Sequence, residues 1–461
     1  MKKLNSFLIA IFVTNIIFAQ TENFKIVIES FQTNYNTEKY DEVFNIFSPE
    51  MQRALPLDNT KQFLSSLKSQ VGKIENKEFV DDIQGATAIY KTKFERAVLA
   101  VHLSLDNQNK ISGLFIKPYE EPTESNTVNA LQIYPSKIAE IIFSKSKDFP
   151  NNSQLSIAII QNGKTNFYGI IKENDSIKPI ENQNKVFEIG SITKLFTSTV
   201  LASFVEDKKI KLTDEINSYY PFTFKGNIKL KFEDLANHTS GLPRLPENQD
   251  LSNETNPYKN YGKKELDDYL QNILKLKNEP STYLYSNLGA GLLGFTLGLS
   301  EKSSFQILLQ QKIFDKYKMT NSYTSSQNLN DKLINGLNTN GEIVSNWDFD
   351  VLFGGGGILS TTEDLAKFAT AQFNPKNKEL ALTRKPTFNI NETMKMGLGW
   401  HILKSEDGKD LFWHNGGTGG YSSSMAVNIE NQTAIIVLSN VSGINEKIDS
   451  LCFELLKNLV K

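Results

Sequence analysis

A serine and a lysine, spaced by two residues, could together begin acyl-transfer chemistry. In Ser191-Ile-Thr-Lys194 the lysine follows the serine by one helical turn, so both side chains lie on the same face of a helix. Gly190 permits a tight approach just before this helix, whose N-terminus favours developing negative charge. Because a serine hydroxyl is a poor nucleophile until a neighbour takes its proton, the pair predicts an activated nucleophile.

Tyr285-Ser-Asn287 supplies a second group that could act as a base. It follows a loop at 280–284 and precedes the small-residue segment 288–294, which predicts entry into a closely packed helix. Free tyrosine has a pKa of about 10, so ionising it at pH 7 costs roughly 4 kcal/mol. A nearby ammonium lowers this cost, whereas burial drives the lysine towards its neutral form. Either way a base would stand beside Ser191, and the sequence leaves open which group holds the proton.

Both motifs have further matches that we interpret as incidental. For an isolated Ser-x-x-Lys match, a helix cap with a surface lysine is the better interpretation, and this applies to Ser65/Lys68 and Ser144/Lys147. Tyr258-Lys-Asn260 lies in a polar loop rich in asparagine. We therefore expect the chemistry at the matches that begin at 191 and 285.

A glycine-rich segment, Trp413-His-Asn-Gly-Gly-Thr-Gly-Gly-Tyr421, leads directly into a strand pattern. Its glycines would let a ligand lie against the backbone, whose N–H groups then become available as donors. A phosphate loop is the competing interpretation, but GxxxxGK[ST] does not occur in the chain. A second glycine run, 354–357, predicts a bend before a helix, with a structural role.

Composition excludes several other classes of protein. The 461 residues contain 50 Lys and Arg against 52 Asp and Glu, for a net charge of −2, which argues against a nucleic-acid partner. The single cysteine, Cys452, excludes an intrachain disulfide and falls in an apolar C-terminal helix pattern. The four histidines lack HExxH spacing, so neither a metal nor another cofactor is expected. The absence of GxSxG weakens an α/β-hydrolase interpretation.

Residues 1–20 are typical of an export signal. Lys2 and Lys3 precede the apolar segment 7–13, and Ala19–Gln20 is an imperfect cleavage site. A membrane anchor is the alternative, but the apolar run is shorter than the roughly 20 residues that a span needs. We expect a periplasmic or secreted protein with no stable membrane span after the signal is removed.

The rest of the chain predicts two domains. Residues 21–120 have helical spacing first and strand patterns from 86 to 119, an α+β order that resembles the NTF2-like fold. Residues 121–128 contain proline and no periodicity and are predicted to be a linker. Residues 129–461 begin and end with strands around a helical middle, which predicts one antiparallel sheet closed around a helical domain. The expected strands cover 155–161, 165–171, 421–429 and 433–438, with a hairpin turn at Asn162-Gly163.

The three motifs, in this order, resemble those of the serine β-lactamase and penicillin-binding-protein superfamily, specifically the class C-like serine hydrolases. The segments 235–243 and 357–365 are also similar to family motifs, and the resemblance covers about 130–461. It implies an α+β, β-lactamase/transpeptidase-like fold: an antiparallel sheet with a helical domain, here preceded by the small α+β unit.

The resemblance also implies roles for individual residues. Ser191 would be the acylated nucleophile, Lys194 its partner and Tyr285 the general base. Asn287 would bind a substrate amide. The backbone N–H groups of Ser191 and Gly417 would form the oxyanion hole.

One departure concerns substrate binding. Many members of the superfamily have Lys-Thr-Gly where this chain has His414-Asn415-Gly416. Histidine is largely neutral near pH 7, whereas lysine is a permanent cation suited to a substrate carboxylate. With His414, Gly416 and Gly417 in the substrate-binding edge, we expect peptidase- or esterase-like hydrolysis rather than strong β-lactam turnover. His238 is expected to shape the site rather than to transfer protons.

Together these features predict an exported serine hydrolase that works through an acyl-serine intermediate. Its substrate would be a D-amino-acid peptide, as in peptidoglycan, an ester or a β-lactam. The alternative is a non-catalytic cell-wall or ligand-binding protein that retains a β-lactamase-like cleft.

Overall fold

The computed structural model describes residues 11–83, 87–119, 126–250, 255–405 and 408–459, and the chain divides into two compact units. The units are Met1–Glu124 and Ser125–Lys461. The predicted linker lies largely outside the described residues, and its last residue, Val128, already begins strand β5 of the second unit.

The first unit consists of helices followed by an antiparallel sheet, in agreement with the α+β class expected for it. The sheet order is β1-β2-β3-β4. One face of α1 is buried at Phe24, Ile28, Phe31 and Tyr35, the helical spacing seen in the sequence. The described elements are α1 (Ile11–Asn36), α2 (Tyr40–Asn45), α3 (Pro49–Ala54), α4 (Leu57–Val71), β1 (Ile74–Ile83), β2 (Thr87–Phe94), β3 (Val98–Leu105) and β4 (Ile111–Pro118).

Strand β1 is an element that sequence reasoning missed. Its sequence, Ile-Glu-Asn-Lys-Glu-Phe-Val-Asp-Asp-Ile, is mostly charged and lacks the alternation that predicts a strand. Phe79 on this strand is 44% exposed, whereas Ile74 at its start is buried, so burial acts on its first residue and leaves no alternating pattern. The strand is stabilised by its ladder to β2, in which Glu78 pairs with Lys91.

The predicted signal segment, residues 1–20, overlaps helix α1 in the structure. Residues 1–10 lie outside the described part of the chain, and the predicted cleavage site at Ala19–Gln20 falls inside α1. No helix among the described residues is long and apolar enough to cross a membrane.

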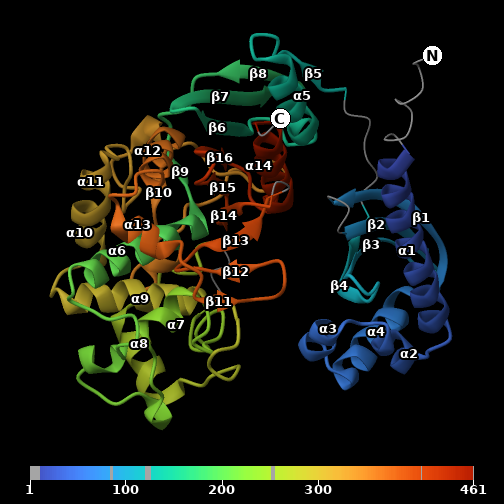
Figure 1. Cartoon of the computed structure of the whole chain (residues 1–461), viewed down its shortest axis with the longest axis horizontal. Coiled ribbons are helices and arrows are strands. Elements are labelled where there is room, and N and C mark those ends of the chain that lie inside the picture. Colours follow the sequence, from blue (N-terminus) through green and yellow to red (C-terminus); the bar gives the residue numbers. More distant parts are fainter. Residues whose placement is uncertain (1–10, 84–86, 120–125, 251–254, 406–407, 460–461) are drawn as a thin grey trace, which may run out of the picture. The chain divides into compact units, whose positions relative to one another are not determined.

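The second unit is built on a single sheet with the order β11-β12-β13-β14-β15-β16-β6-β7-β8-β5 (Figure 1). Neighbouring strands are antiparallel except β5 and β8, and the N- and C-terminal parts of the unit meet where β16 pairs with β6. The prediction of one sheet closed from both ends is confirmed. The strands are β5 (Val128–Asn129), β6 (Gln154–Gln161), β7 (Lys164–Glu173), β8 (Ser176–Ile180), β11 (Phe388–Asn389), β12 (Lys395–Met396), β13 (His401–Lys404), β14 (Asp410–Gly417), β15 (Ser422–Asn428) and β16 (Thr433–Ser439).

The hairpin between β6 and β7 turns at the predicted residues. Asn162 and Gly163 have φ values of +53° and +72°. Positive φ at both central residues matches the right-handed twist of the flanking strands, which is why Asn-Gly is favoured there.

Helices cover both faces of this sheet (Figure 1). On one face, α5 (Ser136–Ser146) and α14 (Asn445–Leu459) enclose an apolar cluster that includes fully buried Cys452, as its helix pattern predicts. The larger helical layer on the other face contains α6 (Thr193–Glu206), α7 (Phe232–Ala236), α8 (Lys263–Asp268), α9 (Asn287–Ser300), α10 (Phe305–Leu309), α11 (Asp315–Tyr317), α12 (Thr362–Gln372) and α13 (Lys378–Thr383). A two-stranded pairing of β9 (Phe187–Glu188) with β10 (Leu359–Ser360) lies beside it.

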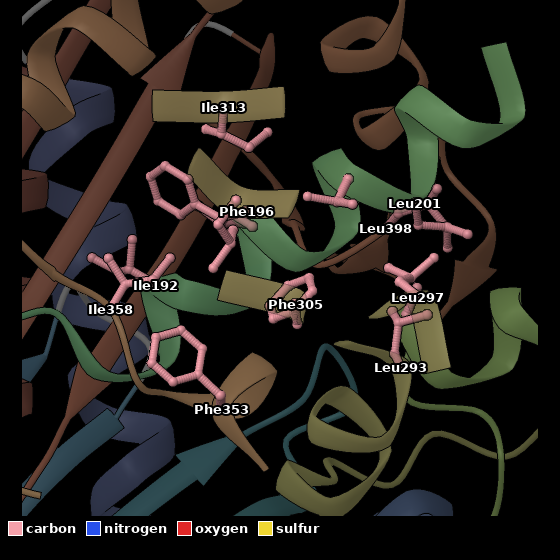
Figure 2. Close-up of a cluster of buried hydrophobic side chains, with 14 of the residues drawn as sticks. Ile192, Phe196, Leu201, Leu293, Leu297, Phe305, Ile313, Phe353, Ile358 and Leu398 are labelled. Atoms are coloured by element: carbon pink, nitrogen blue, oxygen red, sulfur yellow. The ribbon is translucent and has the colours of Figure 1, made fainter. Parts of the chain in front are cut away.

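Helix α6 is buried along almost its whole length. Figure 2 shows Phe196 and Leu201 of this helix among apolar side chains from other elements, including Leu293 and Leu297 of α9. A helix enclosed on all sides cannot shift without opening the core, because protein interiors are close-packed. The start of α6 is therefore a rigid platform.

Candidate active site

Ser191 lies in a tight 3-10 turn, Gly190–Ile192, that leads into α6, and Lys194 lies in the first turn of that helix. The Nζ of Lys194 is 2.9 Å from Ser191 Oγ. The structure therefore brings the two residues into hydrogen-bond contact through the one-turn spacing of the motif. Ser191 is partly exposed, so a substrate can reach its hydroxyl.

Lys194 is 2% exposed and makes two further contacts. Its Nζ donates to Gly355 O at 2.6 Å and to Asn287 Oδ1 at 2.9 Å. Burial, followed by the charge of Arg244, lowers the pKa of Lys194 well below its usual value. Three oxygen atoms, Ser191 Oγ, Asn287 Oδ1 and Gly355 O, thus accept from Nζ and hold the amine beside the serine. Once the amine is neutral, its lone pair can take the hydroxyl proton of Ser191.

The contribution of Gly355 was not expected. The glycine run 354–357 forms a bend, as predicted, over the 3-10 turn η7 (Phe353–Gly355). The bend also directs one carbonyl at Lys194 and another, from Gly354, at the hydroxyl of Thr197. A main-chain acceptor leaves no signal in residue type, so sequence reasoning assigned this segment a structural role alone.

Tyr285 stands next to this pair. Its ring centre lies 4.9 Å from Lys194 Nζ and 4.4 Å from the ring centre of His238. Burial raises the pKa of Tyr285 above its usual value, while a hydrogen bond with Ser191 and the charge of Arg244 act in the opposite direction. Burial has the largest effect, so the site favours a neutral phenol and a neutral amine over a phenolate and an ammonium.

Asn287 is the first residue of α9, where the side chain of Ser286 caps the helix by accepting from Gly289 N. Its amide bridges the site: Oδ1 accepts from Lys194, and Nδ2 donates to Tyr258 Oη at 3.0 Å. Tyr258, which we interpreted as incidental from its loop context, is thus buried beside the site and stacks on Phe349 at 4.4 Å. The interpretation failed because a polar local sequence says nothing about distant aromatic partners.

The glycine-rich segment forms the last residues of β14, beyond its pairing with β13, and the turn of Ser191 lies against them. A Cβ on Gly416 would be 2.1 Å from Ile189 O and 2.8 Å from Ser191 N, and one on Gly190 would be 2.7 Å from Gly417 N. Two backbones approach this closely only where side chains are absent. The N–H groups of Ser191 and Gly417 consequently lie on neighbouring segments.

We expect Gly416→Ala to disrupt this edge. The added methyl would overlap Ile189 O, so the strand or the serine turn must move, which costs about 1–3 kcal/mol in unfolding free energy. A shift of this kind at the nucleophile lowers kcat by about 10²-fold. The control is Gly163→Ala, which strains the turn between β6 and β7 through its φ of +72° but meets no atom within 4 Å, so it should lower stability without lowering kcat. Equal kcat for wild type and Gly416→Ala, measured on one ester substrate, would show that the close approach is not needed.

The rings of His238 and His414 lie next to the phenol of Tyr285, and the ring of His401 lies next to that of His414. His414 and His238 are each 1% exposed, and burial lowers the pKa of both well below the usual value. The Nδ1 of His414 donates to Asn415 O at 2.6 Å, and the Nδ1 of His238 accepts from Ser286 N. His401 Nε2 lies 3.0 Å from the hydroxyl of Tyr283. Within the described ranges, no group of three or more His, Cys, Asp or Glu could hold a metal ion.

Helix α14 is hydrogen-bonded to strand β14 through the side chain of Asn415. Asn415 Nδ2 donates to Asp449 Oδ2 at 2.7 Å, so the side chain of Asn415 is tied to the helix. Burial raises the pKa of Asp449 to about 6, against hydrogen bonds with Ser424, Asn415 and Trp413 that lower it. Sequence reasoning missed this acid, which lies 34 residues beyond its partner Asn415.

This shift predicts a pH-dependent effect of Asp449→Asn. Because the folded-state pKa is raised, ionisation of Asp449 penalises the folded state increasingly as the pH rises from about 4 through 6. The amide of the variant does not ionise, so this pH-dependent penalty on the folded state is absent from it. We expect the Tm of the variant minus that of wild type to be greater at pH 8 than at pH 5. A constant difference across this range, measured by calorimetry, would contradict the assignment.

Arg244 was also missed. It directly follows the family-like segment 235–243, which is the signal that could have found it. Its carbonyl accepts from the backbone N–H groups of Asn287 and Leu288, and its guanidinium lies over the ring of Tyr285.

Two curated proteins are similar to this chain in sequence. The chain is 28% identical over 263 residues to a β-lactamase of Pseudomonas fluorescens, which is 54% of this chain and 69% of that protein. It is 24% identical over 313 residues to protein flp of Staphylococcus aureus (strain N315), covering 62% of this chain and 59% of flp. The chain thus spans about three fifths of the length of flp.

Solved structures have the same fold. A β-lactamase/D-alanine carboxypeptidase from Pseudomonas syringae superposes with a TM-score of 0.58 at 21% identity, over 70% of this chain and 99% of that one. A class C β-lactamase superposes with a TM-score of 0.59 at 21% identity, over 70% and 97%. These likenesses confirm the predicted fold class.

Family models match both units. Residues 29–114 match a model described as "Protein of unknown function (DUF3887)". Residues 150–450, more than half of the chain, match the model described as "Beta-lactamase". The chain therefore belongs to the β-lactamase family.

Proposed function

We propose that this protein is a serine hydrolase that forms an acyl-enzyme at Ser191. The observation that carries the proposal is the 2.9 Å contact between Ser191 Oγ and the buried amine of Lys194, beside the glycine edge of β14. A buried amine with a lowered pKa is a competent base at neutral pH, and a base in contact with a serine activates it.

In the acylation step, Ser191 Oγ attacks the substrate carbonyl carbon and its proton passes to Lys194 Nζ. The carbonyl oxygen becomes an oxyanion that accepts from the N–H groups of Ser191 and Gly417. When the bond to the leaving group breaks, the leaving group takes a proton from the hydroxyl of Tyr285, which is restored by the proton held on Lys194. In deacylation, a water molecule attacks the acyl carbonyl carbon, and its proton passes through the hydroxyl of Tyr285 to Lys194. Lys194 returns a proton to Ser191 Oγ as the bond from the acyl group to Oγ breaks, and the acid is released.

This assignment gives Lys194 and Tyr285 distinct tasks. The opposite directions of their pKa shifts favour Lys194 as the acceptor of the serine proton and Tyr285 as the donor to the leaving group. Asn287, which bridges Lys194 and Tyr258, holds the amine in place and can offer its amide to a substrate.

The substrate is proposed to be a D-amino-acid peptide, a small ester or a β-lactam. The relatives named β-lactamase and D-alanine carboxypeptidase support the first and third of these classes. His414, neutral and buried where the superfamily often has lysine, argues for the peptide and ester classes over rapid β-lactam turnover.

The proposal is tested with a fluorescent penicillin and a fluorescent fluorophosphonate, followed by peptide mapping by mass spectrometry. We expect one labelled peptide that contains Ser191 and turnover of at least one substrate class, scored as kcat/KM. Labelling of another residue would contradict the assignment of Ser191 as the nucleophile. Stoichiometric ligand binding with no turnover of any class would instead support the non-catalytic binding protein.

We further infer that the protein is exported to the periplasm or secreted. The basic residues Lys2 and Lys3, the apolar segment 7–13 and the site at Ala19–Gln20 support this. N-terminal sequencing of protein from fractionated cells is expected to begin at or near Gln20. An intact N-terminus in the cytoplasmic fraction would contradict the inference.

A further inference from the structure

Arg244 is a cation at the site that the proposed mechanism does not use. Its Cζ lies 5.3 Å from the centre of the Tyr285 ring, and the residue is exposed. Within the part of the chain that the structure describes, its guanidinium takes part in no hydrogen bond or ion pair. It therefore has its donors available to a bound molecule.

The main chain of Arg244 is tightly held, which distinguishes it from an ordinary surface arginine. Its carbonyl accepts from Asn287 N at 3.0 Å and from Leu288 N at 3.1 Å, the first two N–H groups of α9. The helix that places Asn287 in the site thus also fixes the position from which the guanidinium extends. The backbone of Arg244 is therefore hydrogen-bonded to the same helix that positions Asn287 in the site.

The electrostatics of the site point to the same residue. Burial raises the pKa values of Tyr285 and Tyr258, and the charge of Arg244 acts on both in the opposite direction. Lys194 is buried, and its hydrogen-bond partners are all within the protein. Arg244 is exposed, and a guanidinium is a permanent cation in proteins.

Building on the acyl transfer proposed at Ser191, we propose that Arg244 determines specificity by binding a carboxylate of the substrate that reaches across the ring of Tyr285. The planar fork of a guanidinium matches the two oxygens of a carboxylate, which a single ammonium cannot do. The chain has a neutral His414 in place of the lysine that the superfamily often uses as a cation. Arg244 restores a positive charge from a different element, the connection between α7 and α8. The preferred substrates are therefore acyl compounds with a free carboxylate.

Matched pairs of esters test this assignment. The first pair is 4-nitrophenyl hydrogen succinate and its methyl ester, which differ by a carboxylate on the acyl side. The second pair is 3-acetoxybenzoic acid and its methyl ester, which differ by a carboxylate on the leaving group. The measured quantity is the ratio of kcat/KM for the acid to that for the methyl ester. The pair with the higher ratio locates the carboxylate.

We expect Arg244→Gln to lower this ratio about 10- to 100-fold in one pair, the range of a charged hydrogen-bonded contact. Arg244→Lys should recover part of the ratio, since it keeps the charge but loses the fork. Lys277→Gln is the control for the loss of one positive charge. The backbone N–H of Lys277 donates to Gly241 O, close to Arg244 in the chain. The side chain of Lys277, however, is exposed, with its Nζ 3.7 Å from a carboxylate oxygen of Glu247. An unchanged ratio in Arg244→Gln, or an equal effect of Lys277→Gln, would overturn the assignment.

A binding measurement separates this inference from the proposed function. In a Ser191→Ala background, which cannot be acylated, calorimetry compares the affinity for each acid with and without Arg244→Gln. A loss of affinity that is confined to the acid supports the role of Arg244, even if the wild type hydrolyses none of the esters. Equal affinities would refute that role whatever the wild type hydrolyses.

Discussion

Ser191→Ala is expected to lower kcat by at least about 10⁴-fold on any substrate that the wild type hydrolyses, because no other group can form the acyl-enzyme. Ser191 is partly exposed and lies in the short turn Gly190–Ile192, so the folded state should tolerate the loss of its hydroxyl. Turnover is measured with the best ester or peptide of the panel, and the trapped acyl-enzyme is measured by intact mass.

The matched control is Ser144→Ala. Ser144 is the serine of another Ser-x-x-Lys match, and its Oγ donates to Ile141 O within α5. Because no element of the site contacts it, its loss should leave kcat within twofold of wild type (a bound on assay scatter, roughly 0.4 kcal/mol). Residual activity above about 1% in Ser191→Ala would mean that the nucleophile lies elsewhere.

Lys194→Met should be the second most damaging change, with a loss of about 10³- to 10⁴-fold in kcat/KM, the upper range for removal of a general base. Tyr285→Phe should lose less, about 10²-fold, because a protonated phenol assists the leaving group and does not activate Ser191. The assignment rests on burial, which lowers the pKa of Lys194 and raises that of Tyr285. A larger loss in Tyr285→Phe would reverse the two roles.

The pH profile gives an independent measurement. In wild type, kcat/KM should rise with pH as Lys194 loses its proton, and this limb should lie below the usual range of a lysine. It should vanish in Lys194→Met and persist in Tyr285→Phe. Lys164→Met, an exposed lysine at the start of β7, controls for the loss of one charge. Removing the amine also leaves Gly355 O and Asn287 Oδ1 unpaired, so the Tm of Lys194→Met must be recorded with its kinetics.

Local order along the chain was sufficient to predict much of this protein. The pairing of Ser191 with Lys194 follows from helix geometry, and the turn at Asn162-Gly163 follows from backbone preferences of adjacent residues. Short apolar runs next to turn residues likewise predicted β6, β7, β15 and β16. The two-residue strands β11 and β12 and the half-charged strand β1 carry no such signal and were missed.

Contacts between distant segments depended on folding. Arg244 and Tyr258 reach the site from the connection between α7 and α8, and Gly355 O reaches it from the bend at η7. Asp449 reaches β14 from the last helix. The preferred protonation of Lys194 and Tyr285 was open in the sequence, since a pKa depends on how far a group is removed from water and on the charges around it. Residue types and their spacing identify the reacting groups, whereas burial in the folded protein determines whether Lys194 or Tyr285 is the protonated one.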